Sequence, residues 1–150
     1  MNYKSPVMYI GTSLCNGKCC REAGIPLSIC QNDGWRANAT IEIADDKIIE
    51  RYISNDITSA ICFAGLEPFE QYDEVFAFVK KLRTDYHCDD TVIIYTGYYK
   101  NEILSQISEL QQFKNIIIKY GRYVPNQKRH FDRVLGVHLA SDNQYAEIIS

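Results

Sequence analysis

Four of the six cysteines lie close together near the amino terminus, in a spacing suited to binding a metal ion or an iron–sulfur cluster. They are Cys15, Cys19, Cys20 and Cys30, and they follow a short apolar segment typical of a β-strand. Thiolates bind zinc and iron strongly, so thiols gathered in one loop favour a metal centre over core packing. An iron–sulfur cluster is the first interpretation, with structural zinc, redox chemistry and disulfides as alternatives.

The composition is that of one ordinary globular domain. The 150 residues are 46% hydrophobic and 23% charged, which is enough chain to build a core without disulfide staples. The net charge of −3 gives no general attraction to phosphate backbones, so nucleic acid is not an expected partner. No apolar run is long enough to cross a bilayer, and no apolar signal stretch opens the sequence. We therefore expect a cytoplasmic protein with reduced thiols and no membrane role.

Alternating strand and helix patterns predict an α/β fold with a parallel sheet. Short apolar runs predict strands over residues 6–11, 59–64, 91–95, 115–119 and 134–139. Helical periodicity lies between them, over residues 45–54, 70–86 and 100–111. The loops that follow parallel strands meet at one edge of the sheet. We therefore expect the cysteine loop and residues 65–68, 95–98 and 141–144 to lie together at that edge.

Several segments share residues with a known family. They are Cys15 and Cys19 with three residues between them, Cys30-Gln31-Asn32 shortly before Trp35, Gly65-Leu66-Glu67-Pro68, Tyr95-Thr96-Gly97-Tyr98 and Ser141-Asp142-Asn143-Gln144. Together they resemble motifs of the radical S-adenosylmethionine (radical SAM) superfamily. Within it, the chain is most similar to the activating proteins of anaerobic ribonucleoside-triphosphate reductase, which are about as short.

The resemblance implies a fold and a set of site residues. The fold would be α/β, a partial (β/α) barrel with parallel strands of the radical SAM type, and residues 1–150 would form a single radical SAM domain. Cys15, Cys19 and Cys30 would hold a [4Fe-4S] cluster through three irons and leave the fourth for S-adenosylmethionine. The residues expected to contact S-adenosylmethionine are Gly65, Glu67, Thr96, Ser141 and Asn143.

The chain departs from the family pattern in its cysteine loop. The family leaves two residues between its second and third cysteines, whereas ten residues separate Cys19 from Cys30 here, with Cys20 as an extra thiol. Cys20 is therefore an alternative for the second or third ligand position. Leu66 also replaces the second glycine of the family's Gly-Gly-Glu/Asp-Pro motif.

The function implied by the resemblance is that of an iron–sulfur oxidoreductase. It would reductively cleave S-adenosylmethionine to a 5′-deoxyadenosyl radical and generate a glycyl radical on the anaerobic ribonucleotide reductase or another glycyl radical enzyme. An external electron donor such as flavodoxin would be needed. Two alternatives stay open: a radical SAM enzyme with another protein or small-molecule target, and a non-catalytic zinc or iron–sulfur module. Colour separates these classes, because a reconstituted cluster is brown and a zinc module is colourless.

Overall fold

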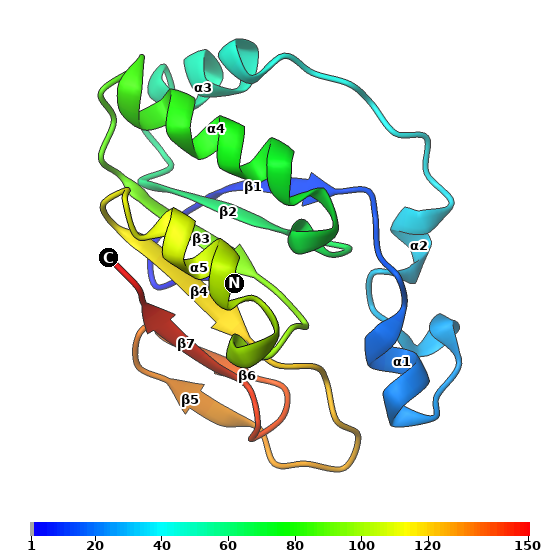
Figure 1. Cartoon of the computed structure of the whole chain (residues 1–150). Helices are drawn as coiled ribbons and strands as arrows, with labels where there is room; N and C mark the ends of the chain where they lie inside the picture. The colour runs from blue at the N-terminus through cyan, green and yellow to red at the C-terminus, as the bar shows by residue number, and fades with distance from the viewer. Residues whose placement is uncertain (1) are drawn as a thin grey trace.

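A computed structural model describes residues 2–150 and shows a mixed α/β fold built on a five-stranded sheet (Figure 1). The strands are β1 (Met8–Thr12), β2 (Ala60–Gly65), β3 (Thr91–Tyr95), β4 (Ile116–Tyr120) and β7 (Tyr145–Ile148), in the order β1-β2-β3-β4-β7. The first four are parallel, and β7 runs antiparallel to β4. The carboxyl ends of the four parallel strands therefore share one edge.

Three helices cover one face of the sheet (Figure 1). They are α3 (Asp45–Ile53), α4 (Tyr72–Thr84) and α5 (Leu104–Leu110). Because side chains alternate across a strand, Ile61, Ile94 and Ile118 point into the core that these helices form. Burial of such β-branched residues on central parallel strands explains why the strands are near-continuous apolar runs.

The opposite face is covered by smaller elements. A hairpin of β5 (His130–Asp132) and β6 (Val137–Leu139) forms a separate two-stranded sheet. Leu135 and Leu139 from this region pack with Cys62 and Ile93 in a second apolar cluster. Cys62 is completely buried there, which agrees with its position inside an apolar strand.

The cysteine loop lies beyond the ends of the parallel strands (Figure 1). After β1 it contains α1 (Lys18–Ala23), the 3-10 helix η1 (Leu27–Ile29) and α2 (Asp33–Arg36). Two further 3-10 helices, η2 (Pro68–Gln71) and η3 (Lys100–Glu102), follow β2 and β3 at the same edge. Glycines in the left-handed region, Gly17 and Gly24, flank α1, and the short helix ends because its backbone turns there.

Most predicted elements are confirmed, but the last strand is not where the sequence placed it. The predicted strand 91–95 coincides with β3, and the predicted helix 70–86 contains α4. The predicted strand 134–139 shrinks to β6, which pairs with β5 outside the main sheet. The fifth strand of the main sheet is β7, so the prediction that every strand is parallel was wrong. After β6 the chain turns back and pairs with the free edge of β4, so β7 runs in the direction opposite to β4.

The sheet formed by residues 2–150 is open, with β1 and β7 as its two edges. No closed barrel is formed by this part of the chain, and the partial barrel of the radical SAM type stays a prediction. None of the helices in residues 2–150 has both the length and the apolar character needed to cross a membrane.

Candidate metal centre

A cavity of about 380 Å³ opens at the carboxyl edge of the sheet, within the range of roughly 300–1,000 Å³ typical of small-molecule sites. Its walls come from the loops after all four parallel strands. The lining includes Cys15, Cys19, Cys20, Cys30, Gly65, Glu67, Thr96, Gly97, Lys119 and Gly121. The edge that the sequence predicts thus gathers all three predicted ligands and three of the five predicted cofactor contacts.

The thiols of the cavity are free and differ in their surroundings. None of the six cysteines forms a disulfide. The Cys15 sulfur accepts hydrogen bonds from the backbone N–H of Gly17 (3.3 Å) and from the Arg36 guanidinium (3.4 Å). Burial and the neighbouring Glu67 raise the pKa of Cys19 to about 11. Cys19 is therefore a neutral thiol until a metal displaces its proton.

Four thiols share the walls of one cavity, and sulfur is the donor that an iron–sulfur cluster uses. In residues 2–150, no three Cys, His, Asp or Glu side chains converge closely enough to bind one metal ion. A zinc ion needs its sulfurs at ~2.3 Å from a single point. A [4Fe-4S] cluster binds each thiolate through a different iron, so its ligands stand apart around the cluster. Four thiols on the walls of one cavity fit that group.

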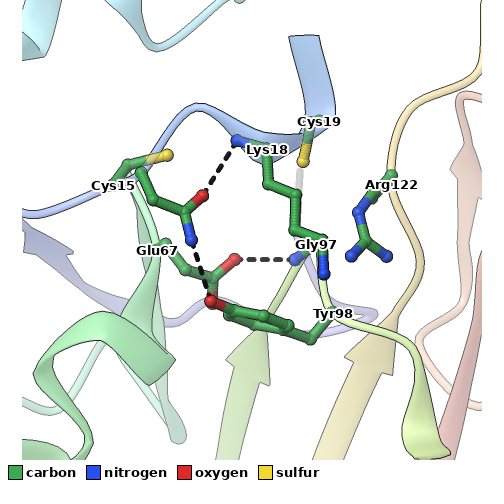
Figure 2. Close-up of a pocket in the computed structure, with 8 residues that line it drawn as sticks. Cys15, Lys18, Cys19, Glu67, Gly97, Tyr98 and Arg122 are labelled. Carbon is green, nitrogen blue, oxygen red and sulfur yellow. Dashed lines mark hydrogen bonds between the residues drawn. The ribbon is translucent and has the colours of Figure 1, made fainter. Parts of the chain in front are cut away.

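Because Gly97 has no side chain, the Cys19 sulfur can occupy the space beside its backbone. A Cβ added at Gly97 would lie 2.6 Å from the Cys19 sulfur, far inside van der Waals contact. In Figure 2 the sulfur of Cys19 points at the backbone of Gly97. The backbone of Gly97 is not in the left-handed region, so an alanine here is disfavoured by space and not by conformation, and it would require the Cys19 sulfur to move.

We expect Gly97→Ala to lower the cluster content without removing a thiol. Overpacking costs about 1–3 kcal/mol, which here favours displacement of the Cys19 sulfur. Iron and sulfide per chain after anaerobic reconstitution measure the effect. Gly34→Ala is the matched control, because an added Cβ at Gly34 meets nothing within 4 Å. Equal iron and sulfide in the two variants would contradict the prediction.

Glu67 joins the end of β2 to the end of β3. It is only 6% exposed. One carboxylate oxygen accepts hydrogen bonds from the Thr96 hydroxyl (2.7 Å) and the Phe69 backbone (3.1 Å), and the other accepts one from the Gly97 backbone (2.8 Å). Burial raises the pKa of Glu67, and these donors oppose the rise. The second oxygen keeps acceptor capacity toward the cavity.

Lys119 is a charged residue of the cavity that the sequence analysis missed. It is 7% exposed on β4, and its ammonium donates to the Gly121 carbonyl at 2.9 Å. Burial lowers its pKa to about 8, although Cys19 and Glu67 act in the opposite direction. Within the described part of the chain the ammonium forms no ion pair. The available signal was one lysine, directly after three isoleucines, in a strand that is otherwise apolar or aromatic.

An ion network fastens α1 to the sheet edge. Arg122 is 3% exposed and donates to both carboxylate oxygens of Glu102, at 2.8 and 2.6 Å. Its Nε lies 2.9 Å from Glu22 of α1. Lys18, also on α1, lies 2.5 Å from Glu102. Two residues of the cysteine helix are therefore held by groups that follow β3 and β4.

We expect Glu102→Gln to destabilise the apoprotein by about 1 kcal/mol at neutral pH, a value reduced for partial exposure. The Arg122 and Lys18 hydrogen bonds lower the pKa of Glu102 from 4.5 to about 2. A carboxyl pKa lower in the folded state stabilises the fold above the unfolded pKa, and this contribution is lost as the pH falls. The difference between wild type and variant in urea unfolding should therefore shrink between pH 4.5 and pH 2. A difference independent of pH would contradict this role.

Asn32 and Trp35, which follow Cys30 in the family-like motif, pack against the glycines at the ends of β1 and β2. The Asn32 amide donates to the Gly65 carbonyl at 2.6 Å. The Trp35 ring covers Gly11 and Gly65, where added Cβ atoms would lie 2.6 and 3.0 Å from ring carbons. Gly65 has φ +103°, a conformation that favours glycine. Gly65 therefore lines the cavity and also allows Asn32 and Trp35 of the cysteine loop to pack against the end of β2.

Ser141 and Asn143 lie beside the cavity but do not line it. Ser141 is fully buried and accepts a hydrogen bond from the Val124 backbone at 3.3 Å. The Asn143 amide donates to the Arg122 carbonyl at 2.9 Å. The flanking Ala140 and Gln144 reach the cavity wall. In this structure Ser141 and Asn143 fix loops, and their contact with a cofactor stays a prediction.

The open sheet and the thiol-lined cavity at its carboxyl edge define an α/β domain with a cysteine-rich site. More specifically, the chain belongs to the 4Fe-4S single cluster domain family, whose model matches residues 12–145. No curated protein and no solved structure matches the chain. An iron–sulfur cluster is therefore the metal group of this family, and the thiol-lined cavity is our candidate for its site.

Proposed function

We propose that the protein is a radical SAM enzyme that activates a glycyl radical enzyme, with the anaerobic ribonucleotide reductase as its target. When bound, the [4Fe-4S] cluster supplies one electron for cleavage of S-adenosylmethionine to methionine and a 5′-deoxyadenosyl radical. Cys15, Cys19 and Cys30 would hold the cluster. The electron would come from an external donor such as flavodoxin.

One observation carries the proposal: the thiol-lined cavity also contains a buried carboxylate and a buried ammonium. Glu67 and Lys119 both line it and act on each other electrostatically, yet they form no ion pair within the described residues. A carboxylate and an ammonium that are held apart suit a ligand with an amino group and a carboxylate of its own. The methionine part of S-adenosylmethionine has both groups.

The residues around the opening of the cavity favour the proposal that the substrate is another protein. Tyr9, Ile29 and Tyr123 line the cavity and are 39%, 59% and 42% exposed. Exposed apolar and aromatic side chains around an opening favour contact with another protein. A glycine-bearing loop of a large partner enzyme could then close the cavity and exclude water from it.

The test uses the anaerobically reconstituted, chemically reduced protein with S-adenosylmethionine. Methionine and 5′-deoxyadenosine should form slowly with the protein alone. Addition of the cognate anaerobic reductase should accelerate their formation and give a glycyl radical doublet in the electron paramagnetic resonance spectrum. Cleavage without acceleration or doublet would indicate another target. Absence of any cleavage, with the cluster intact, would overturn the radical SAM assignment.

A further inference from the structure

The cavity holds one thiol more than a three-cysteine cluster needs. Cys20 lines it together with Cys15, Cys19 and Cys30, and it is the most buried of the four, at 5% exposed. The extra thiol is therefore inside the site and not on the outer surface of the loop.

Cys19 and Cys20 present their sulfurs to different parts of the cavity. Neighbouring residues on an α-helix point roughly 100° apart. The Cys19 sulfur lies against Gly97, and the groups that act on it electrostatically are Glu67, Cys15, Arg122 and Lys119. The groups that act electrostatically on Cys20 are Cys30, Arg36, Cys15 and Asp33. Cys15 acts on both thiols, whereas Cys30 is among the groups that act on Cys20 and not among those that act on Cys19, so Cys20 lies toward Cys30.

The position of Cys20 is fixed by the local backbone. Its carbonyl accepts a hydrogen bond from the Ile25 backbone at 3.0 Å, where the left-handed Gly24 ends α1. Arg36 donates to the Cys15 sulfur and acts electrostatically on Cys20 and Cys30, and its Nε also lies 3.3 Å from the Asp33 carboxylate. A guanidinium in this place offsets the negative charge that several thiolates would bring together.

We propose that Cys20 is a fourth thiolate ligand, which binds the iron left open by Cys15, Cys19 and Cys30 when no other ligand is present. Ligation by Cys20 in the resting protein does not depend on the proposed function. Its displacement by S-adenosylmethionine does. In that exchange the Cys20 sulfur would leave the iron and take up the proton that the cofactor's ammonium loses, the neutral amino group and the carboxylate would take its place, and no electron would be transferred.

The test compares wild type, Cys20→Ala, Cys20→Ser and Cys88→Ala without S-adenosylmethionine. Cys88 is a thiol outside the cavity. An iron without a protein ligand is held only by sulfide and solvent, so mild ferricyanide oxidation removes it first. Electron paramagnetic resonance detects the resulting [3Fe-4S] cluster. We expect Cys20→Ala to lose one iron several-fold faster than wild type and Cys88→Ala. Cys20→Ser, which keeps a donor atom of similar size, should lie between them.

Two results would overturn the proposal. Equal rates of iron loss in Cys20→Ala and wild type would show that Cys20 is no ligand. Failure of both Cys20 variants to assemble a cluster, with unfolding curves of their apoproteins unchanged, would make Cys20 one of the three essential ligands.

A separate arm adds S-adenosylmethionine to the reduced proteins. Wild type and Cys20→Ala should then give the same cluster spectrum, because the cofactor has displaced Cys20. If the wild-type spectrum does not change while Cys20→Ala still loses iron faster, ligation by Cys20 stands and the displacement fails. That outcome would count against the radical SAM function and favour electron transfer by a fully thiolate-bound cluster.

Discussion

Replacement of Cys15, Cys19 or Cys30 by alanine is expected to abolish the stable [4Fe-4S] cluster almost completely. Each of these thiols lines the cavity, and loss of one of the three anchoring thiolates exposes its iron to solvent in addition to the iron that Cys20 or S-adenosylmethionine binds exchangeably. Iron and sulfide per chain after anaerobic reconstitution measure the loss. The brown colour should disappear with them.

The controls for this experiment are the two cysteines outside the cavity. Cys62→Ala and Cys88→Ala should keep the cluster, because Cys62 is buried in β2 and Cys88 packs at the edge of the helix-covered core. Normal cluster content in Cys30→Ala, together with loss in Cys20→Ala, would exchange the roles of Cys20 and Cys30. Bound zinc in place of iron in the natively purified protein would favour the structural module.

Glu67→Gln is expected to weaken S-adenosylmethionine binding by about ten- to a hundredfold while the cluster is retained. A hydrogen bond from the cofactor's amino group to the Glu67 carboxylate is charge-assisted and contributes roughly 1.5–3 kcal/mol. The variant keeps the shape of the side chain but places an N–H₂ group where an oxygen now accepts from Thr96 or Gly97. Anaerobic titration of the reconstituted protein gives the dissociation constant.

The matched control is Glu74→Gln, an exposed carboxylate on α4. It should leave the dissociation constant unchanged. Unfolding of both apoproteins by urea separates binding from stability, because Glu67 also joins β2 to β3. If Glu67→Gln loses stability but binds S-adenosylmethionine as wild type does, the carboxylate has only a structural role, which is to connect the ends of β2 and β3.

The sequence was informative where the signal is local. β3 is a run of β-branched residues ended by Thr96-Gly97, and its bounds were predicted without error. The helix over residues 70–86 was also predicted, because its apolar residues recur at helical spacing on one side. Thiol spacing in residues 15–30 indicated metal chemistry before any contact was known. In each case the residues that carry the signal are neighbours along the chain.

The short elements could not be predicted in the same way. β7 has only four residues, and it forms because β4 offers a free edge with unpaired backbone groups. α1 is a six-residue helix, too short to be stable by itself, and it is held by Arg122 and Glu102. Their structure depends on partners far along the chain.

The sequence by itself determined that this is an α/β domain with a thiol-rich loop at the end of its first strand. Only the tertiary structure decided which groups share the cavity with the thiols. Lys119 enters it because the parallel register of β3 and β4 sets it opposite Tyr95, on the face away from the helices. Cys19 meets Gly97 because α1 docks on the loop after β3. These contacts join residues dozens of positions apart, and a shift of one residue in register would turn each side chain to the other face of the sheet.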